Sequence, residues 1–188
     1  SELIGQPLEP DVPLAIPDNS PAGIESALVV ADDVTLTDVN VRVQIDHTWV
    51  GDLYIALRAP DNTEVVLLDR PGVPASSTVG CSNDNMDVTF DDDSAFDPED
   101  HCAGTTPWYV GTANPVGSLA AFNGMSSAGT WRLFVTDNAG SDTGTIVNWE
   151  LITTPAIAGV CTVCVPVQGD ADLEIVKSTA TGTVLPGD

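Results

Sequence analysis

Hydrophobic and polar residues alternate in four short segments of the chain. Alternation with a period of two is typical of a β-strand with one buried face. The hydrophobic positions are Val39, Val41, Val43 and Ile45; Leu53, Ile55 and Leu57; Trp131, Leu133 and Val135; and Val147, Trp149 and Leu151. Clusters of Gly, Asn, Asp and Pro, which favour turns, bound these segments. No segment sustains the apolar spacing of a helix, so the pattern predicts an all-β fold.

Short strands with Gly- and Pro-rich connections are typical of two packed sheets. The sequence therefore predicts a jelly-roll β-sandwich of two antiparallel sheets. The stretch HTWVGDLYIALRAPDNTEVVLLD, residues 47–69, indicates two strands around a Pro-Asp-Asn-Thr turn. A chain of 188 residues is long enough for one well-buried domain with additional segments, and too short for two of ordinary size.

Composition divides the chain into four parts. Residues 1–15 contain three prolines without alternation, which predicts an N-terminal linker. Residues 16–155 hold the sandwich, and residues 156–171 form a cysteine-containing linker. Residues 172–188 begin a possible immunoglobulin-like repeat or form a C-terminal tail, since they resemble the opening of repeats found in many bacterial surface and secreted proteins.

The charge of the chain is strongly negative. There are 28 acidic and 5 basic residues, with a formal net charge of -23. This balance argues against nucleic acid or an anionic membrane surface as a partner and favours cations. No stretch has the apolar length of a membrane span, and the first residues lack the features of a signal peptide, so we expect no membrane insertion.

The four cysteines are even in number and lie in segments rich in Gly, Asp and Ser. This favours disulfides, which we expect to join Cys81 to Cys102 and Cys161 to Cys164. The alternative is zinc, because Cys161 and Cys164 have the spacing of half a zinc site, but no second close pair follows. Disulfides indicate an oxidising compartment, so we expect a secreted, extracellular or cell-surface protein.

An acidic insert lies between Cys81 and Cys102. Eight of its residues are acidic, and no Lys or Arg occurs between Arg70 and Arg132. Calcium, which takes six to eight oxygen ligands, is the expected cofactor, gathering this charge into one place. The expected ligands are Asp46, Asp52, Asp91, Asp92, Asp93 and Asp97. The alternative is a solvated acidic loop that aids solubility in a salty habitat.

Asp52 lies at the very start of a predicted strand. The loops of a jelly roll gather at its ends, so a cation could join Asp52 to the Asp91–Asp93 cluster. Alternatively, Asp52 fixes the preceding turn through backbone hydrogen bonds. Asp137 and Asp142 could also bind calcium, but their Gly-rich hairpin favours an interpretation as turn residues.

Aromatic residues suggest a ligand-binding surface. Trp131 and Trp149 follow the buried pattern and are expected in the core. Trp108 and Tyr109 follow Cys102 in a predicted loop, where exposed rings could stack on sugars or hold peptides.

No catalytic constellation is evident, and we expect a non-enzymatic protein. His47 and His101 are the only imidazole bases, and the Gly-x-Ser-x-Gly motif is absent. His47 follows Asp46, but neighbours in a strand point to opposite faces and do not form a dyad. The sequence therefore favours a structural His47 at a strand end.

Two long stretches resemble a known family: IDHTWVGDLYIALRAPDNTEVVLLDRPG and LAAFNGMSSAGTWRLFVTDNAGSDTGTIVNWELI. They are similar to the P domain, also called the Homo B domain, which follows the subtilisin-like catalytic domain in proprotein convertases and many bacterial secreted proteases. The matching elements, in order, are His47-Thr48, Gly51-Asp52-Leu53, Pro60-Asp61, Phe122-Asn123-Gly124, Gly129-Thr130-Trp131, Asp137-Asn138, Asp142-Thr143-Gly144-Thr145 and Trp149.

The resemblance implies a jelly roll without catalysis of its own. Its implied role is to support folding or stability of an adjacent subtilisin-like protease, or substrate attachment. The expected partner is thus a protease domain. The alternative is a carbohydrate- or protein-binding adhesion module of a bacterial surface protein, with neighbouring surface modules and a polymer or protein target as partners.

Overall fold

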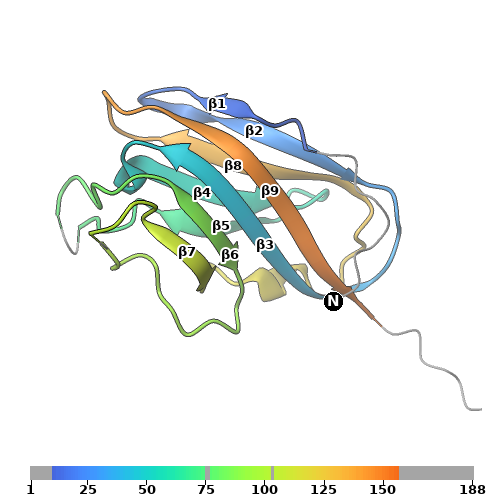
Figure 1. The fold of residues 1–188 in the computed structure, drawn as a ribbon. Helices are drawn as coiled ribbons and strands as arrows, with labels where there is room; N and C mark the ends of the chain where they lie inside the picture. Colours follow the sequence, from blue (N-terminus) through green and yellow to red (C-terminus); the bar gives the residue numbers. More distant parts are fainter. Residues whose placement is uncertain (1–9, 75–76, 103, 157–188) are drawn as a thin grey trace, which may run out of the picture. The chain divides into compact units, whose positions relative to one another are not determined.

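A computed structural model describes residues 10–74, 77–102 and 104–156. These residues form two sheets packed face to face (Figure 1). The five-stranded sheet has the order β1 (Leu14–Ile16), β9 (Gly144–Pro155), β3 (Leu36–His47), β6 (Met86–Phe90) and β7 (Tyr109–Ala113). The four-stranded sheet has the order β2 (Ser20–Val30), β8 (Gly129–Asp137), β4 (Leu53–Arg58) and β5 (Glu64–Asp69). Two short 3-10 helices are η1 (Val50–Asp52) and η2 (Leu119–Phe122).

The predicted sandwich of antiparallel sheets is confirmed, with one parallel pair at an edge. β7 runs parallel to β6, whereas the other paired strands are antiparallel. A parallel pair requires a long crossover connection. The segment from residue 91 to residue 108 provides it, so part of the acidic insert serves to carry the chain between these two strands.

The hairpin predicted at residues 47–69 is present as β4 and β5. Its turn is closed by hydrogen bonds from Ala59 N–H to Thr63 O (2.8 Å) and from Asn62 N–H to Ala59 O (2.9 Å). Asn62 has a φ of 72°, a conformation that asparagine adopts more readily than most residues. The turn residues therefore match the backbone geometry that the hairpin requires.

The core lies between the sheets, where the alternating hydrophobic positions meet. The predicted inward residues of β3, β4 and β8 are between 0% and 1% exposed. They are Val39, Val41, Val43, Ile45, Leu53, Ile55, Leu57, Trp131, Leu133 and Val135. Burial of these side chains supplies the main favourable term for folding.

The prediction for β9 is wrong at one position. Val147 was expected on the buried face but is 39% exposed, while its neighbour Ile146 is 0% exposed. The cause is a β-bulge: Gln44 pairs with Asn148 and Ile45 with Ile146, which leaves Val147 as the extra residue. A bulge changes the direction of the side chain at the inserted residue, so Val147 faces outward.

Two predicted core tryptophans are confirmed, and each satisfies its indole N–H. Trp149 on β9 donates to Ser26 Oγ on β2 (2.8 Å), which joins the two sheets. Trp131 on β8 donates to Ser127 O (2.8 Å), and its ring packs edge-on against Phe122 of η2. These bonds remove the penalty for burying the indole nitrogens.

The predicted disulfide between Cys81 and Cys102 is confirmed, with an S–S distance of 2.01 Å. The second predicted pair, Cys161 and Cys164, lies outside the described residues, as do residues 1–9 and the part of the chain after residue 156. The predicted domain boundaries therefore stay predictions. Within the described ranges, no helix is long and apolar enough to cross a membrane.

Removing part of a core side chain should destabilise the sandwich strongly. Leu133 is 0% exposed, so Leu133→Ala should lower the free energy of unfolding by about 2–5 kcal/mol. Val116 is 49% exposed, and Val116→Ala should change it by less than about 0.5 kcal/mol. Urea denaturation followed by tryptophan fluorescence measures both. Equal losses in the two variants would contradict the assignment of the core.

Candidate functional site

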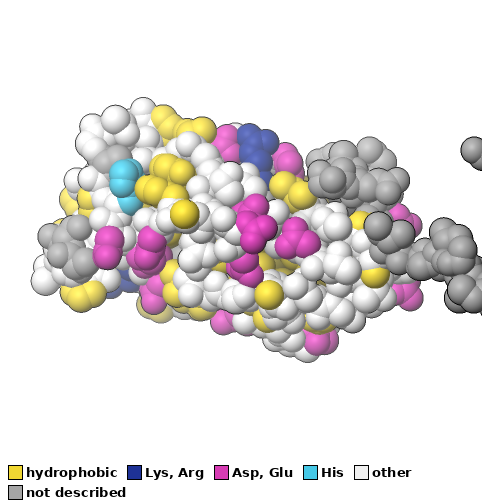
Figure 2. All heavy atoms as spheres, turned by 90° about the horizontal axis from the view of Figure 1, so that it is seen from below, with side chains coloured by type: hydrophobic (Ala, Val, Ile, Leu, Met, Phe, Trp, Pro, Cys, Tyr) yellow, Lys and Arg dark blue, Asp and Glu magenta, His cyan; other side chains and the backbone are white. Residues whose placement is uncertain are grey.

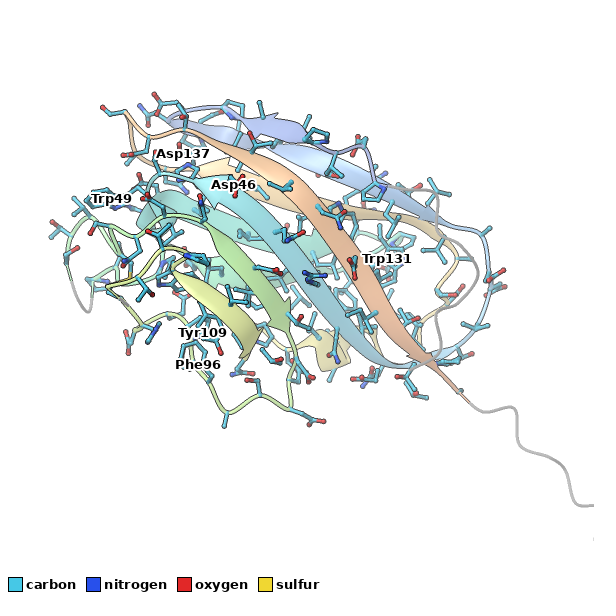
Figure 3. All side chains as sticks on the ribbon, viewed as in Figure 1. Asp46, Trp49, Phe96, Tyr109, Trp131 and Asp137 are labelled. Carbon is cyan, nitrogen blue, oxygen red and sulfur yellow. A yellow bond between two sulfur atoms is a disulfide. The ribbon has the colours of Figure 1, made fainter. Side chains whose placement is uncertain are left out.

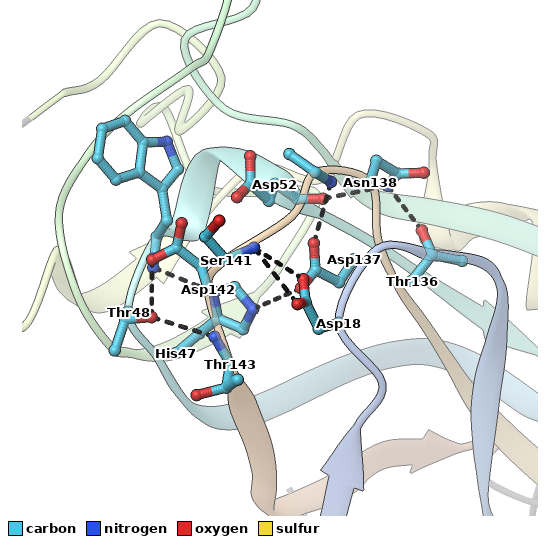
Figure 4. Close-up of polar contacts among 12 residues, drawn as sticks. Asp18, His47, Thr48, Asp52, Thr136, Asp137, Asn138, Ser141, Asp142 and Thr143 are labelled. Atoms are coloured by element: carbon cyan, nitrogen blue, oxygen red, sulfur yellow. Dashed lines mark hydrogen bonds and ion pairs between the residues drawn. The ribbon is translucent and has the colours of Figure 1, made fainter.

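Several motif residues meet at one end of the sandwich (Figure 4). His47 ends β3 and pairs with Gly144 of β9, while Leu53 after η1 pairs with Asp137 at the end of β8. The strand pairing thus brings together His47, Asp52, Asp137 and Asp142, which are far apart in the sequence. We call these four residues the His–Asp cluster.

The imidazole of His47 and the carboxylate of Asp137 form a buried pair between the sheets. Nε2 of His47 lies 3.3 Å from Oδ2 of Asp137, and both side chains are fully buried. The backbone N–H of Trp49 donates to Nδ1 of His47 (3.1 Å). Because Nδ1 accepts this bond, the ring proton is on Nε2 and is donated to Asp137. Asp137 Oδ1 accepts the N–H of Ala139 (3.1 Å), so both of its oxygens are bonded.

Gly144 makes room for the imidazole. A Cβ at this position would lie 2.3 Å from Cδ2 of His47 and 2.7 Å from the carbonyl oxygen of Asp46. Neither a buried ring nor a paired backbone can move away cheaply, so the position requires glycine. The glycine of the Asp142–Thr145 motif element is therefore explained by the packing of His47.

Asp52 is the least satisfied member of the His–Asp cluster. It is 2% exposed, and its Oδ2 has no hydrogen-bond partner within the described residues. Its backbone carbonyl accepts bonds from the N–H (2.9 Å) and side-chain amide (3.1 Å) of Asn138. Burial, with the negative charges of Asp137 and Asp142, raises the pKa of Asp52 to about 6. The carboxylate is therefore held in an environment that disfavours its charge.

The loops around the cluster are tied by further carboxylates. Asp142 Oδ1 accepts the hydroxyl proton of Thr48 (2.9 Å), and Thr48 Oγ1 accepts the N–H of Thr143 (3.1 Å). Asp18 accepts the N–H of Ser141 with both oxygens, at 3.1 and 3.3 Å. The local turn bond expected in this hairpin is made by Asp137, which accepts the N–H of Ala139, whereas Asp142 links two loops that are distant in sequence and is a charged neighbour of Asp52.

The expected meeting of Asp52 with the Asp91–Asp93 cluster is wrong. Asp91 accepts a hydrogen bond from the side chain of Asn40 on β3 (3.1 Å). Asp52 instead lies near His47, which follows Asn40 by seven residues on the same strand. At about 3.3 Å per residue this separates the two places by about 20 Å. The register of β3 and β6 is the cause: Met86 pairs with Ile45 near His47, whereas Phe90 pairs with Val41, so β6 carries the chain away from the His47 end of β3 before it reaches Asp91.

Three carboxylates of the acidic insert, those of Asp91, Asp92 and Asp97, accept hydrogen bonds from backbone N–H groups. Both oxygens of Asp92 accept backbone N–H bonds from the start of η2, at Leu119 and Ala120 (2.9 Å each). Asp91 accepts the N–H of Asp93 (2.8 Å), and Asp97 accepts the N–H of Glu99 (3.0 Å). Such bonds fix turns without a cation.

The acidic side chains are thus not gathered into one place as expected. Figure 2 shows them scattered over one face of the molecule. Within the residues that the structure describes, no group of three or more His, Cys, Asp or Glu side chains is arranged to hold a metal ion. Asp46 lies on the outer face of β3, separate from both Asp52 and the Asp91–Asp93 cluster.

The expected exposed contact at Trp108 is also wrong. Trp108 is 1% exposed, and its indole N–H donates to the carbonyl of His101. Tyr109 is half-buried, with Phe96 stacked on its ring at 4.2 Å (Figure 3). A buried indole cannot stack on a sugar, so the observation that suggested carbohydrate binding is removed. The sequence pattern did not reveal this because the insert folds back over both rings.

The fold and the buried cluster define a β-sandwich domain whose motif residues stabilise the junction of two sheets. A family model described as the proprotein convertase P-domain matches residues 36–153. The chain belongs to the proprotein convertase P-domain family. The resemblance noted in the sequence is thereby confirmed, and its motif elements include all four residues of the His–Asp cluster.

Curated relatives include a calcium-dependent protease of Nostoc sp., 30% identical over 134 residues, covering 70% of this chain and 16% of that protein. Leupeptin-inactivating enzyme 1 of Streptomyces exfoliatus is 29% identical over 153 residues, covering 78% and 26%. A solved structure, the serine protease of Aeromonas sobria in a complex with a chaperone, matches with a TM-score of 0.49 at 21% identity, covering 81% of this chain and 26% of that one. The chain thus spans about a quarter or less of these relatives.

Replacing Gly144 should disturb the His–Asp cluster. Gly144→Ala places a methyl group against the His47 ring, and we expect it to lower the free energy of unfolding by about 1–3 kcal/mol. A methyl group added at Gly104 would meet no atom within 4 Å, so Gly104→Ala serves as the matched control and should be nearly neutral. Urea denaturation measures both, and a neutral Gly144→Ala would contradict the packing argument.

The stability of the protein should depend on pH through Asp52. A carboxyl group whose pKa is raised on folding stabilises the folded state at low pH, and this contribution is lost as pH rises from the ordinary pKa of 3.8 to about 6. Asp52→Asn removes the cost of ionisation. In the presence of EGTA, we therefore expect the variant to gain stability relative to wild type between about pH 4.5 and pH 7.5, by about 1–2 kcal/mol.

Urea denaturation at both pH values gives this difference. Burial also raises the pKa of Glu99, to about 7, but Glu99 is present in both proteins and its contribution cancels in the comparison. A difference between the two proteins that stays constant across the pH range would show that Asp52 has an ordinary pKa.

Proposed function

We propose that this chain is the non-catalytic accessory domain of a subtilisin-like protease and that it supports the folding and stability of that enzyme. The observation that carries the proposal is the match of residues 36–153 to the proprotein convertase P-domain. The names of the relatives, a calcium-dependent protease and a leupeptin-inactivating enzyme, support an association with proteolysis. The similarity covers only 16% and 26% of these two relatives, so their substrates are not carried over to this chain.

The geometry of the His–Asp cluster supports a structural role. His47 and Asp137 have the bonding of a base and its orienting carboxylate, but their side chains have no exposed surface. A catalytic base must reach the proton that it removes from a substrate or a nucleophile. A pair that is sealed between two sheets instead holds the sheets together.

We further propose that the protein is secreted. The disulfide between Cys81 and Cys102 supports this, because such bonds persist in oxidising compartments and are rare in the cytosol. The strongly negative net charge is compatible with an extracellular protein that stays soluble through charge repulsion.

We also propose that calcium stabilises the domain, at a site with fewer ligand side chains than the sequence indicated. Asp52 supports it, because a buried carboxylate oxygen without a partner beside two further carboxylates is a natural ligand for a hard cation. Asp52 and Asp142 would supply two of the six to eight oxygen ligands and would have to close around the ion, because the described residues hold no preformed group of three side chains. The charge of the ion would offset the repulsion within the cluster. Asp92 fits less well, because both of its oxygens already bond to η2.

The accessory role is tested on the complete gene. We expect it to encode a subtilisin-like domain ahead of residue 1, and deletion of residues 36–153 should lower the yield of secreted active protease at least several-fold. Leu133→Ala in the complete protein should have a smaller effect in the same direction. A gene that encodes only surface-protein repeats, or a deletion that leaves the protease yield unchanged, would contradict the proposal.

Calcium binding is tested by thermal unfolding in EGTA and in excess calcium. Calcium at about 100 times its Kd should stabilise the wild type by about 2.7 kcal/mol. Asp52→Asn should abolish the response, whereas Asp93→Asn, which changes an exposed carboxylate of the acidic insert, should keep it. Loss of the response only in Asp93→Asn would move the site to the insert, and an unchanged wild-type transition would exclude calcium stabilisation.

A further inference from the structure

The disulfide between Cys81 and Cys102 is connected to η1 by backbone contacts. The N–H of Gly51 donates to the carbonyl of Cys81 (3.0 Å), and the N–H of Val50 donates to the carbonyl of Asn83 (3.0 Å). A Cβ at Gly51 would lie 2.5 Å from the backbone nitrogen of Cys81, so the two backbones are in direct contact. The segment around Cys81 therefore supplies two of the hydrogen bonds that hold η1 in place.

The disulfide is the covalent anchor of this segment. Cys81 lies in the long connection between β5 and β6, and Cys102 lies in the crossover from β6 to β7. A Cβ at Gly72 would lie 2.7 Å from Sγ of Cys102 and 2.8 Å from Sγ of Cys81, so the connection also packs against both sulfur atoms. Cys81 donates its N–H to the carbonyl of Pro71 (2.8 Å). Once the disulfide is open, only such non-covalent contacts keep Cys81 beside η1.

The carboxylate of Asp52 opposes this arrangement. Asp52 is the last residue of η1, is 2% exposed, and has an Oδ2 without a hydrogen-bond partner in the described ranges (Figure 4). Burial, and then the charges of Asp137 and Asp142, disfavour its ionised form. Opening of η1 would hydrate the carboxylate, so the ionised form favours the open state. The disulfide and the charge of Asp52 therefore act on η1 in opposite directions.

A thiol can reach the disulfide at Cys102. Cys102 is exposed, whereas Cys81 is 1% exposed. A thiolate attacks Sγ of Cys102, and the sulfur of Cys81 leaves as a thiolate and takes up a proton. A second thiol then releases Cys102 from the mixed disulfide, so that the reductant becomes a disulfide and both cysteines become thiols. Both cysteines lie outside the strands, so reduction can free the Cys81 segment while the sheets stay paired.

We propose that the Cys81–Cys102 disulfide is a redox switch that decides whether Asp52 stays in the His–Asp cluster. The closed disulfide holds Cys81 against η1 and keeps Asp52 buried. After reduction by a thiol, η1 opens and Asp52 meets water. Because coupling between two sites is reciprocal, a change that removes the cost of burying Asp52 also makes the disulfide harder to reduce. The proposal deepens the proposed calcium stabilisation and rests on it only for the effect of calcium.

The test is the fraction of the disulfide present at equilibrium in mixtures of reduced and oxidised dithiothreitol at neutral pH. Free thiols are alkylated, and mass spectrometry of the digested protein reports on Cys81 and Cys102. In EGTA, we expect Asp52→Asn to shift the equilibrium towards the disulfide by about 5-fold or more, as is usual for coupled sites. Asp93→Asn removes the same charge from an exposed position of the acidic insert and should leave the equilibrium unchanged.

Two further measurements separate opening of η1 from unfolding of the whole domain. Leu133→Ala weakens the core, and Leu133 pairs with β2 and β4, not with η1. It should shift the equilibrium by less than about 2-fold, because the reduced protein keeps its sheets. In wild type, hydrogen exchange should show that reduction removes protection from the amides of Val50 and Gly51 and preserves it at Leu133.

Calcium gives an arm of the test that can fail by itself. Excess calcium should shift the equilibrium of wild type and of Leu133→Ala towards the disulfide and leave Asp52→Asn unaffected. An effect of Asp52→Asn in EGTA without any effect of calcium on wild type would support the switch and contradict only the calcium site.

The switch would be overturned if Asp52→Asn had the same equilibrium as wild type in EGTA. A shift beyond about 2-fold towards the thiols in Leu133→Ala would also overturn it, because the reduced state would then be the unfolded chain. Thermal stabilisation by calcium together with either result would leave the calcium proposal standing and reject the switch.

Discussion

The hydrogen bond between His47 and Asp137 closes one end of the sandwich by joining the last residues of two strands from different sheets. Its two partners are fully buried, so removal of either leaves a polar group without water or a partner, which costs more than the bond itself contributes. The surrounding features follow from this pair. Gly144 is small because the ring occupies its side-chain space, and the Trp49 N–H selects the ring tautomer that donates to Asp137.

The same end of the molecule concentrates negative charge at buried positions, where ionisation of a carboxyl group costs free energy. Asp52 lies beside the pair with an unbonded oxygen, and its raised pKa expresses first the cost of burying a carboxylate and then the repulsion by Asp137 and Asp142. Sites that retain such a cost are candidates for function. An accessory domain that takes up a cation only outside the cell would gain stability there, which is the physical basis for joining calcium to the proposed role in protease folding.

The carboxylates of the acidic insert and of Asp46 behave differently, because hydrogen bonding and not composition decides what each carboxylate does. In the acidic insert, Asp92 accepts backbone N–H groups with both oxygens, and Asp91 and Asp97 each accept one. Asp46 makes no side-chain hydrogen bond within the described ranges and is exposed on the outer face of β3. The same residue type therefore caps backbone N–H groups in the connection after β6 and stays exposed on the face of β3.

Alternation along β3, β4 and β8 determined the strands, their buried faces and the sandwich, because a period of two leaves only one way to hide those side chains. The turn at Asn62, the Cys81–Cys102 disulfide and the family motifs were equally readable, since each depends on residues close in sequence or on a fixed pattern. Only the tertiary structure decided which loops lie at the same end of the sandwich. The pairing of β3 with β6 separated Asp52 from Asp91, a bulge turned Val147 outward, and the crossover from β6 to β7 buried Trp108, because register and bulges depend on contacts between distant strands.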